Sequence, residues 1–395
     1  MKWASAISTQ ENLNSCIKET TADIKKSLGG VEPHLTIVFV SPHYAGEIDK
    51  IPEKIRAEMA PGILFGCTGG GIIGAGEEVE QQSAFSITCA YLPDVEIKTI
   101  YSDTLNLPDQ DTSPRVWREW LNISDDKKPQ FLFLADPFSF HGEEFLAGID
   151  FAYPNSKKVG GLASGARQPG GNRMFLDDKI YSKGVIGLAL CGNIQLDTIV
   201  AQGCRPIGEP MNITKCDQQF IRELNGRPPM EILQEIFDTL NEKDRELLQT
   251  SLFLGIEMDA MNEHPKQGDF LIRNLMGADR ESGGISVGAL LREGQLVQFH
   301  LRDKNMSSED LNMVLTRYQE ENDYHSAAGA LLFSCLGRGQ YLYGKPNHDS
   351  ELFQEKIGSL PLGGFFCNGE IGPVGSSTFL HGYTSSFGIF RPAVV

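Results

Sequence analysis

Apolar runs recur along the chain in a fixed order with polar and glycine-rich segments. The run LTIVFVSP at 35–42 ends at a turn, a polar stretch with helical spacing covers about 46–60, and ILFGCTGGG follows. Two further apolar runs, SAFSITCAYLP and EIKTIYS, complete the unit. Because short apolar runs bounded by turn residues favour strands, the predicted order is strand, helix, strand, glycine-rich loop, strand, strand.

The same order appears again, beginning with QFLFLADP at 130–137. The helix-like GEEFLAGIDFAYP follows, then VGGLASG and the apolar runs RMFLDDKIYSK, GVIGLALC and QLDTIVA. Ile37 and Leu64 are 27 positions apart in the first unit, and Phe131 and Val159 are 28 positions apart in the second. Matching order and spacing predict an internal duplication.

A third copy is predicted from GALLFSCLGRG at 329–339, through HDSELFQEKIG and LPLGGFFCNGEIGPVG, to TSSFGIFR. A fourth, weaker copy is expected to begin at TSLFLGIE (250–257) and to end in a hairpin within GGISVGALLREGQLVQFHLRD. A polar helical segment at about 217–250 contains PPMEILQEIFDTL, with proline at a helix start. These features predict an α/β or α+β fold of mixed or antiparallel sheets in two domains, 1–215 with two repeats and 216–395.

The glycine-rich stretch from Gly66 to Gly76 raises the question of a phosphate-binding loop. Gly69, Gly71 and Gly74 fit the spacing G-x-G-x-x-G. A dinucleotide loop needs a helix directly after the glycines, whereas here the acidic EEVEQQ and a strand follow. The sequence also lacks G-K-S and G-K-T. We therefore expect a turn between strands, with glycine permitting close backbone approach, and no dinucleotide cofactor.

Composition and charge narrow the function classes. The net charge of −17 argues against general nucleic-acid binding and against adhesion to anionic membranes, because phosphates would be repelled. No apolar run approaches the roughly 18 residues of a membrane-spanning helix. The start, MKWASAIST, lacks the pattern of a secretory signal, so we expect a cytoplasmic protein.

The cysteines and histidines are scattered. No C-x-x-C, H-x-x-x-H or H-E-x-x-H spacing is present, so a metal site has no sequence support. We expect the eight cysteines to be reduced thiols. They stand at positions Cys16, Cys67, Cys89, Cys191, Cys204, Cys216, Cys335 and Cys367.

Several stretches together resemble a known family. The opening MKWASAIST, the loop LFGCTGGGIIG, the turn CLGRG and the segments GFFCNGEIGPVG and FLHGYTSSFGIF are similar to the FIST family. This family comprises paired FIST-N and FIST-C sensory domains of bacterial signalling proteins and some F-box proteins. The resemblance covers nearly the whole chain. It implies an intracellular sensor of small molecules such as amino acids, and no catalytic residue set comes with it.

Two strand ends in the third copy carry the candidate ligand-binding residues. Arg338 follows Cys335 in SCLGRG. A cysteine near a cation can be an activated thiolate, and a guanidinium suits a carboxylate; alternatively, the thiol is buried and the arginine pairs with an acid. Cys367, Asn368 and Glu370 lie in FFCNGEIGP, where Asn and Glu can hydrogen-bond a ligand, unless they only shape a turn.

Further candidates lie at comparable corners. His381 can pair with a cysteine as nucleophile and base, or can be structural. Asp136 ends a strand of the second copy, and Ser41 and His43 occupy the comparable corner of the first, where helix capping is the simpler alternative. Equivalent strand ends tend to share one edge, so these corners are expected to surround one cleft.

The site expected in the third copy joins its two strand ends. The first and third elements of a strand–helix–strand unit are often neighbours, which would bring Arg338 near Asn368 and Glu370, with His381 on the following segment. We expect a non-catalytic small-ligand sensor that acts through a separate signalling partner. The alternatives are a hydrolase or transferase that uses a cysteine or a His/Glu pair, and a protein-interaction scaffold.

Overall fold

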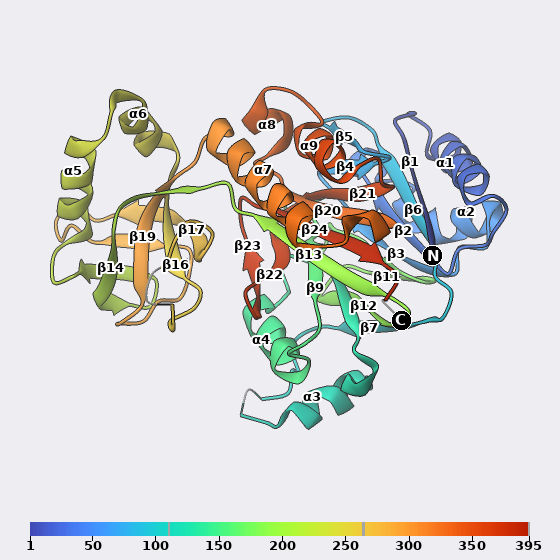
Figure 1. Ribbon diagram of the computed structural model, residues 1–395, viewed down its shortest axis with the longest axis horizontal. Coiled ribbons are helices and arrows are strands. Elements are labelled where there is room, and N and C mark those ends of the chain that lie inside the picture. Colours follow the sequence, from blue (N-terminus) through green and yellow to red (C-terminus); the bar gives the residue numbers. More distant parts are fainter. Residues whose placement is uncertain (110, 263–264, 394–395) are drawn as a thin grey trace. The chain divides into compact units, whose positions relative to one another are not determined.

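The structure is a computed structural model that describes residues 1–109, 111–262 and 265–393 (Figure 1). The chain forms two compact units, Met1–Val200 together with Met313–Val395, and Ala201–Asn312. The second unit is thus an insertion within the first. The division at 215/216 expected from the sequence groups the chain differently, because it assumes domains that are continuous in sequence.

The first repeat of the first unit keeps the predicted strand, helix and strand at 35–68, but the glycine loop continues into a short hairpin (Gly71–Gly74 and Glu77–Glu80). The runs EIKTIYS and QLDTIVA, expected at the ends of the first two units, each begin the repeat that follows. The elements of the first repeat are β1 (Lys2–Ser8), α1 (Leu13–Leu28), β2 (Leu35–Val40), α2 (Ile51–Glu58), β3 (Ile63–Thr68), β4 (Gly71–Gly74), β5 (Glu77–Glu80) and β6 (Phe85–Tyr91). Short 3-10 helices, η1 (Pro42–Tyr44) and η2 (Ile48–Lys50), precede α2. Helix α1 begins where the Asn12 side chain accepts a hydrogen bond from the Ser15 N–H, and it ends at Gly29 in the left-handed conformation.

Two more repeats share this plan, which confirms the predicted duplication and the third copy. The second contains β7 (Val95–Ser102), α3 (Pro114–Leu121), η3 (Asp125–Lys127), β8 (Gln130–Ala135), α4 (Gly142–Ala152), β9 (Lys158–Leu162), β10 (Met174–Leu176), β11 (Lys179–Tyr181) and β12 (Val185–Gly192). The third contains β13 (Gln195–Ala201), α7 (Lys304–Glu321), η4 (Tyr324–Ser326), β20 (Gly329–Cys335), α8 (Gly339–Tyr343), α9 (His348–Ile357), β21 (Leu362–Cys367), β22 (Glu370–Val374), β23 (Ser377–His381) and β24 (Ser385–Arg391).

Each repeat builds one mixed sheet and lends a hairpin to another. The strand orders β1-β6-β2-β3, β7-β12-β8-β9 and β13-β24-β20-β21 are equivalent, with a parallel pair at the end of each. The last two strands of each sheet are a hairpin from another repeat: β4-β5 pairs with β21, β10-β11 pairs with β3, and β22-β23 pairs with β9. The exchange is cyclic and gives three six-stranded sheets. This architecture confirms the expected class of mixed sheets in an α+β fold.

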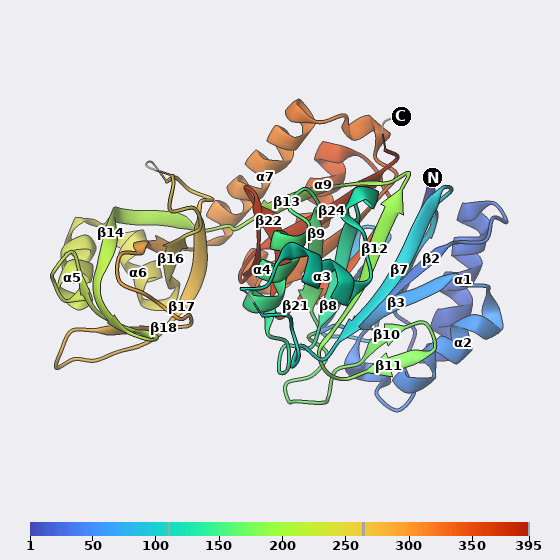
Figure 2. The same cartoon turned by 90° about the horizontal axis from the view of Figure 1, so that it is seen from below.

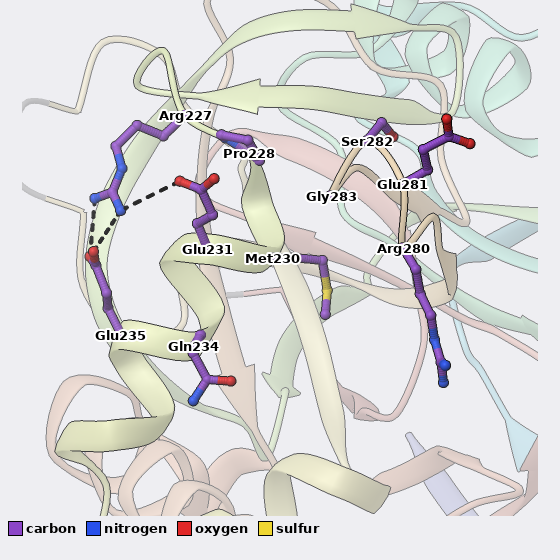
Figure 3. Close-up of a pocket in the computed structure, with 10 residues that line it drawn as sticks. All are labelled: Arg227, Pro228, Met230, Glu231, Gln234, Glu235, Arg280, Glu281, Ser282 and Gly283. Carbon is purple, nitrogen blue, oxygen red and sulfur yellow. Dashed lines mark hydrogen bonds and ion pairs between the residues drawn. The ribbon is translucent and has the colours of Figure 1, made fainter.

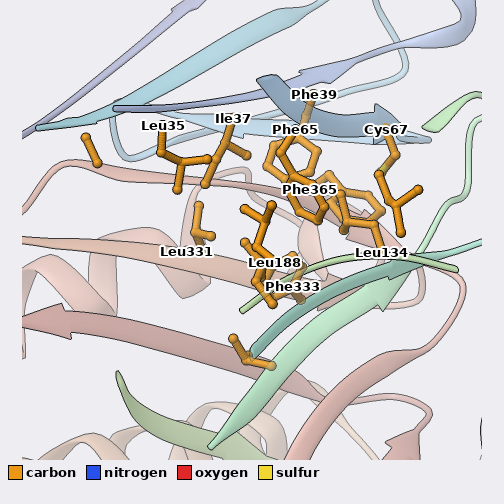
Figure 4. Close-up of a cluster of buried hydrophobic side chains, with 14 of the residues drawn as sticks. Leu35, Ile37, Phe39, Phe65, Cys67, Leu134, Leu188, Leu331, Phe333 and Phe365 are labelled. Atoms are coloured by element: carbon orange, nitrogen blue, oxygen red, sulfur yellow. The ribbon is translucent and has the colours of Figure 1, made fainter. Parts of the chain in front are cut away.

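The main hydrophobic core lies between the three sheets (Figure 4). Phe39 of the first sheet stacks on Phe365 of the third, with ring centroids 4.8 Å apart, and Phe333 meets Phe365 edge-on at 5.9 Å. Leu134 joins them from the second sheet. Residues at alternate positions face outward, where Val38 and Val40 join a second hydrophobic cluster with residues of α1 and α2. Figure 2 shows these two helices beside β2 and β3. Nearly continuous apolar strands, buried on both faces, follow from this layering.

One glycine recurs at the same place in every repeat. A Cβ at Gly66, Gly160 or Gly364 would lie 1.9, 1.8 or 1.9 Å from a carbonyl oxygen of the paired parallel strand. No other residue fits such a close approach. These glycines therefore fix the alignment of the three repeats.

The second unit is a closed barrel with two helices. Its elements are β14 (Arg205–Asp217), β15 (Phe220–Leu224), α5 (Pro229–Thr239), α6 (Glu242–Thr250), β16 (Leu252–Glu257), β17 (Phe270–Ala278), β18 (Ile285–Val287) and β19 (Leu296–Leu301). The fourth repeat expected from 250–257 was wrong: β16 pairs antiparallel with β17 and β19, and the described residues between β16 and β17 contain no helix. Helix α5 begins at the predicted proline.

Candidate functional site

The glycine-rich stretch Gly66–Gly76 connects strands, as predicted. It runs from β3 through a turn into β4 and β5, and β4 lies on β21 of the third repeat. The glycines allow close packing, because a Cβ at Gly71 would lie 2.6 Å from the ring of Phe366, and one at Gly69 would lie 3.0 Å from Phe365. These contacts account for the glycines without a bound phosphate.

The turns that follow the parallel strands of the three repeats meet one another. The N–H of Gly70 donates to Ser164 Oγ at 2.8 Å, and Ser164 Oγ donates to the carbonyl oxygen of Phe366. The N–H of Asn368 in turn donates to the carbonyl oxygen of Leu162 at 3.1 Å. The three equivalent turns thus share hydrogen bonds at one end of the sheets.

The three central strands also end in equivalent positions. In each repeat, one residue of the central strand is paired with the recurring glycine of the parallel strand. Ser41, Asp136 and Cys335 each lie three residues after that position, so they are equivalent. Ser41 Oγ accepts from the N–H of Ala84, and Asp136 accepts from the side chains of Ser139 and Asn172. The comparable corners inferred from the sequence for Ser41 and Asp136 are therefore confirmed. Both side chains are buried within networks of their own repeats.

The two predicted strand ends of the third repeat are neighbours. Strands β20 and β21 are parallel, and Cys335 is the register partner of Cys367. The N–H of Leu336 donates to the carbonyl oxygen of Cys367 at 3.0 Å. Cys335 is partly exposed, whereas Cys367 is buried. The adjacency expected for these two segments is therefore confirmed.

Arg338 lies beneath this turn in a buried ion pair. Its guanidinium is fully buried and binds Asp349 through two bonds, Nε to Oδ2 at 2.8 Å and Nη2 to Oδ1 at 3.0 Å. Nη2 also donates to the Tyr343 hydroxyl at 2.5 Å. Burial alone would raise the pKa of Asp349, but the charge and hydrogen bonds of Arg338, with a bond from Ser385, lower it to about 2. The pair is therefore ionised and rigid.

Glu370 and Arg338 hold opposite sides of one turn. Glu370 is buried, and its Oε2 accepts from the N–H of Thr384 at 3.1 Å and from its hydroxyl at 2.8 Å. Nη1 of Arg338 lies 3.5 Å from the carbonyl oxygen of Tyr383. Tyr383 has a φ of +69°, a conformation that costs a non-glycine residue about 1–3 kcal/mol. Two buried ionisable side chains thus stabilise a strained turn.

His381 and Asn368 complete the predicted set. His381 is buried opposite Glu370 on the β22–β23 hairpin, and its Nε2 lies 3.0 Å from the carbonyl oxygen of Gly372. Asn368 is exposed, and its Nδ2 donates to the carbonyl oxygen of Ala163 at 3.3 Å. The structure therefore brings all six sequence-predicted residues to neighbouring turns and hairpins. Arg338 pairs with an acid, Asp349, which is the alternative that the sequence left open for this residue.

We call one set of these residues the corner site. Its rim is at least partly exposed, and its base is buried. The rim consists of Cys335, Leu336, Asn368 and Tyr383, and the base of Arg338, Asp349 and Glu370. Asp349 was missed because an acid in the first turn of the helix expected at HDSELFQEKIG usually faces solvent, whereas the start of α9 turns this acid inward. Tyr383 carried no sequence signal, since its backbone conformation follows from tertiary contacts.

An exchanged hairpin from the first repeat also reaches the corner site. Oε1 of Glu78 on β5 accepts from the N–H and hydroxyl of Ser350, both at 2.8 Å, next to Asp349. Burial and then the charge of Asp349 raise the pKa of Glu78 to about 8. Burial also raises the pKa of Glu80, which accepts from the N–H of Gln340 at 2.7 Å. Glu78 and Glu80 of the stretch EEVE are thus packed against α9 and α8, whereas Glu77 is exposed.

Several cavities lie away from the corner site. One of about 570 Å³ lies in the barrel unit, between the start of α5 and the β17–β18 turn (Figure 3). Arg227 there is clamped by Glu235 at 2.6 Å, while Arg280 extends from the opposite turn. Cavities of about 450 and 360 Å³ adjoin β7 with α3 and α1 with α2.

Two further features of the described residues concern metal binding and membrane crossing. No group of three or more His, Cys, Asp or Glu side chains among them is placed to hold a metal ion. None of the helices in the described part of the chain combines the length and the apolar character needed to cross a membrane. All eight cysteines are thiols in the structure.

Comparisons with known proteins cover almost the whole chain. The model of the FIST N domain matches residues 34–227, and that of the FIST C domain matches residues 229–373. An uncharacterized protein of Mycobacterium tuberculosis is 33% identical over 99% of this chain and 100% of its own length. One of Mycobacterium bovis is 31% identical over 99% of each chain. An F-box/LRR-repeat protein of Arabidopsis thaliana is 29% identical over 32% of this chain and 27% of its own.

Proposed function

The chain belongs to the FIST family, and on that basis we propose that it is a cytoplasmic sensor that binds a small molecule at the corner site. FIST domains are sensory, ligand-binding domains of signalling proteins. The choice of site rests on the strained Tyr383 turn, which lies between the buried side chains of Arg338 and Glu370 under a partly exposed rim. Strain of this kind concentrates at ligand clamps, where the surrounding structure maintains it.

The ligand class follows from the groups at the rim. Asn368 offers an amide, Cys335 a thiol and Leu336 an apolar contact, which together suit a small polar metabolite such as an amino acid. Arg338 is fully buried, it donates to Asp349 and Tyr343, and its Nη1 is directed at the Tyr383 carbonyl oxygen, so we assign it a positioning role in place of the direct carboxylate contact expected from the sequence. In this proposal, the residues of the rim contact the ligand, and the buried residues of the base hold the rim in position.

Output is proposed to pass through a separate protein. One relative is by name an F-box/LRR-repeat protein, and by analogy the FIST part of this chain is proposed to act with an interaction partner. We propose no catalysis. Nothing in this proposal requires a metal or an organic cofactor.

A ligand screen tests the proposal. The purified protein is heated with a panel of amino acids, short peptides and common metabolites, and its melting temperature is recorded. A ligand at a hundredfold excess over Kd stabilises the folded state by about 2.7 kcal/mol. Asn368→Ala is expected to weaken binding at least severalfold, whereas Asn14→Ala, on the exposed face of α1, leaves it unchanged.

Three outcomes contradict the proposal. Ligand affinity that is unchanged in both Asn368→Ala and Leu336→Ala, with native circular dichroism, places the site elsewhere, and the cavity of Figure 3 is then the next one to examine. Consumption of a compound from the panel, measured by mass spectrometry, supports the hydrolase or transferase alternative. Protein binding without any small-molecule binding supports a scaffold.

A further inference from the structure

Two cysteines of the third repeat lie side by side at the ends of parallel strands. Cys335 is the last residue of β20, Cys367 is the last residue of β21, and the two are direct register partners. Neighbouring strands are about 4.8 Å apart, and registered residues point to the same face of the sheet. Disulfides form where the Cα atoms are roughly 4.4–6.8 Å apart. The backbone spacing therefore already suits a disulfide.

The side chains point to the same interior. Cys367 belongs to the core between the sheets, as does Phe333, which lies two residues before Cys335 on the same face of β20. Burial raises the pKa of Cys367 well above its ordinary value, and the charges of nearby Glu370, Cys67 and Cys335 raise it further. A charge effect between the two thiols is expected only if their sulfur atoms are close.

The surroundings give the two thiols different roles. Cys335 is partly exposed at the turn, and its Sγ accepts a hydrogen bond from the N–H of Gly337 at 3.5 Å. Cys367 is fully buried, with its sulfur against Gly161, where a Cβ would lie 2.4 Å away. An oxidant from solvent reaches Cys335 first, because access and thiolate character decide which cysteine reacts. Cys367 is then placed to resolve the product.

We propose that Cys335 and Cys367 form a dithiol that hydroperoxides convert into a reversible disulfide. The Cys335 thiolate attacks the peroxide, giving the sulfenic acid and, with hydrogen peroxide as oxidant, one molecule of water. The Cys367 sulfur then displaces the sulfenic hydroxyl, which leaves as a second water, and the S–S bond forms. A small thiol reductant restores both thiols by exchange.

The disulfide changes the corner site directly. Leu336 and Asn368, the residues after the two cysteines, belong to its rim, and Leu336 is hydrogen-bonded to the Cys367 carbonyl oxygen. Linking the two sulfur atoms fixes the start of the turn from Cys335 to Arg338 onto β21. This redox chemistry stands independently of the ligand proposal, because it rests on the strand register alone.

Thiol counting on the full chain tests the proposal. The reduced protein is exposed to hydrogen peroxide, denatured in an alkylating reagent and counted. The expected count falls from eight thiols to six and returns to eight after treatment with dithiothreitol. Peptide mapping by mass spectrometry is expected to join the peptides of Cys335 and Cys367.

Variants separate the steps. Cys335→Ser is expected to keep its seven thiols in peroxide, and Cys367→Ser is expected to accumulate a sulfenic acid at Cys335 that dimedone traps. Cys216→Ser, a partly exposed position in the barrel unit, should still form the disulfide. If Cys367→Ser does not fold, the peptide map of the unmodified chain still decides. A disulfide between other cysteines, oxidation of Cys335 without loss of the Cys367 thiol, or a constant count of eight overturns the proposal.

Discussion

Replacing Glu78 by glutamine should change how the stability of this protein depends on pH. Glu78 lies on the exchanged strand β5, with only 4% of its surface exposed, and its Oε2 has no hydrogen-bond partner among the residues that the structure describes. Oε1 accepts both bonds from Ser350. Glutamine keeps the shape and the accepting oxygen, but it cannot ionise. The substitution therefore removes one titration and little else.

The magnitude follows from the pKa of Glu78. It rises from an ordinary 4.5 to about 8, because of burial first and the charge of Asp349 second. Since the folded state holds this proton more tightly, the unfolded chain loses it first as pH rises. Stability therefore falls between pH 4.5 and about 8, by at most about 5 kcal/mol from this group. Asp349 titrates below this window, because its pKa is about 2.

Melting curves at several pH values measure the effect. At pH 5 the Glu78→Gln variant and the parent chain should melt within about 2 °C of each other. At pH 8.5 the variant should be more stable, and even half of the maximal difference shifts the melting temperature by about 5 °C. Glu77→Gln, an exposed neighbour on the same strand, should show no such trend.

A constant difference between variant and parent from pH 5 to 8.5 would refute this reasoning. So would a variant that becomes relatively less stable as pH rises. Glu80 also has a raised pKa, but it is present in both chains and cancels in the comparison. The test therefore isolates the contact between the exchanged hairpin and α9.

Other predictions concern the same unit. Arg338→Ala should lower the free energy of unfolding, measured in urea, by about 3–5 kcal/mol, because it leaves Asp349 buried without its cation. The double variant Arg338→Ala/Asp349→Asn removes that buried charge and should lose less stability. A smaller loss in the single variant than in the double variant would contradict this explanation. Gly364→Ala should abolish native melting or lower its midpoint by more than about 10 °C, whereas Gly46→Ala, with open space around the added Cβ, should change little. Titration with NAD(P) or FAD should show no micromolar binding, and such binding lost on Gly71→Ala would show that the glycine turn does hold a dinucleotide.

The repeat order was predictable because each strand–helix–strand unit is local. The similar sequence separations, from Ile37 to Leu64 and from Phe131 to Val159, reflect a helix of similar length between two parallel strands. The hairpin exchange was not predictable in the same way. Strands β4 and β5 follow β3 in the chain whichever sheet accepts them, so periodicity cannot show that β4 pairs with β21. The false fourth repeat has a related cause, since a short apolar run reads alike in a barrel and in a parallel pair.

The site was predictable to a similar depth. Turn glycines and polar residues at strand ends marked the segments around Cys335 and Asn368, and parallel pairing brought them together. The partner of Arg338 was not predictable, because Asp349 sits in the first turn of a helix, a position that acids also occupy on exposed helices. Its inward direction depends on how α9 packs on the sheet, which no local pattern records.

The threefold repetition explains why the corner site lies in the third repeat. Ser41, Asp136 and Cys335 occupy equivalent positions, yet they present a hydroxyl, a carboxylate and a thiol. The first two are buried and hydrogen-bonded within their own repeats, which stabilises the turns around them. Cys335 alone of the three is partly exposed, and it adjoins both the buried ion pair and the strained Tyr383 turn. Duplication thus gave three similar corners. Two of them have buried, hydrogen-bonded side chains, and the third, with its partly exposed thiol, is the one where we propose ligand binding and oxidation.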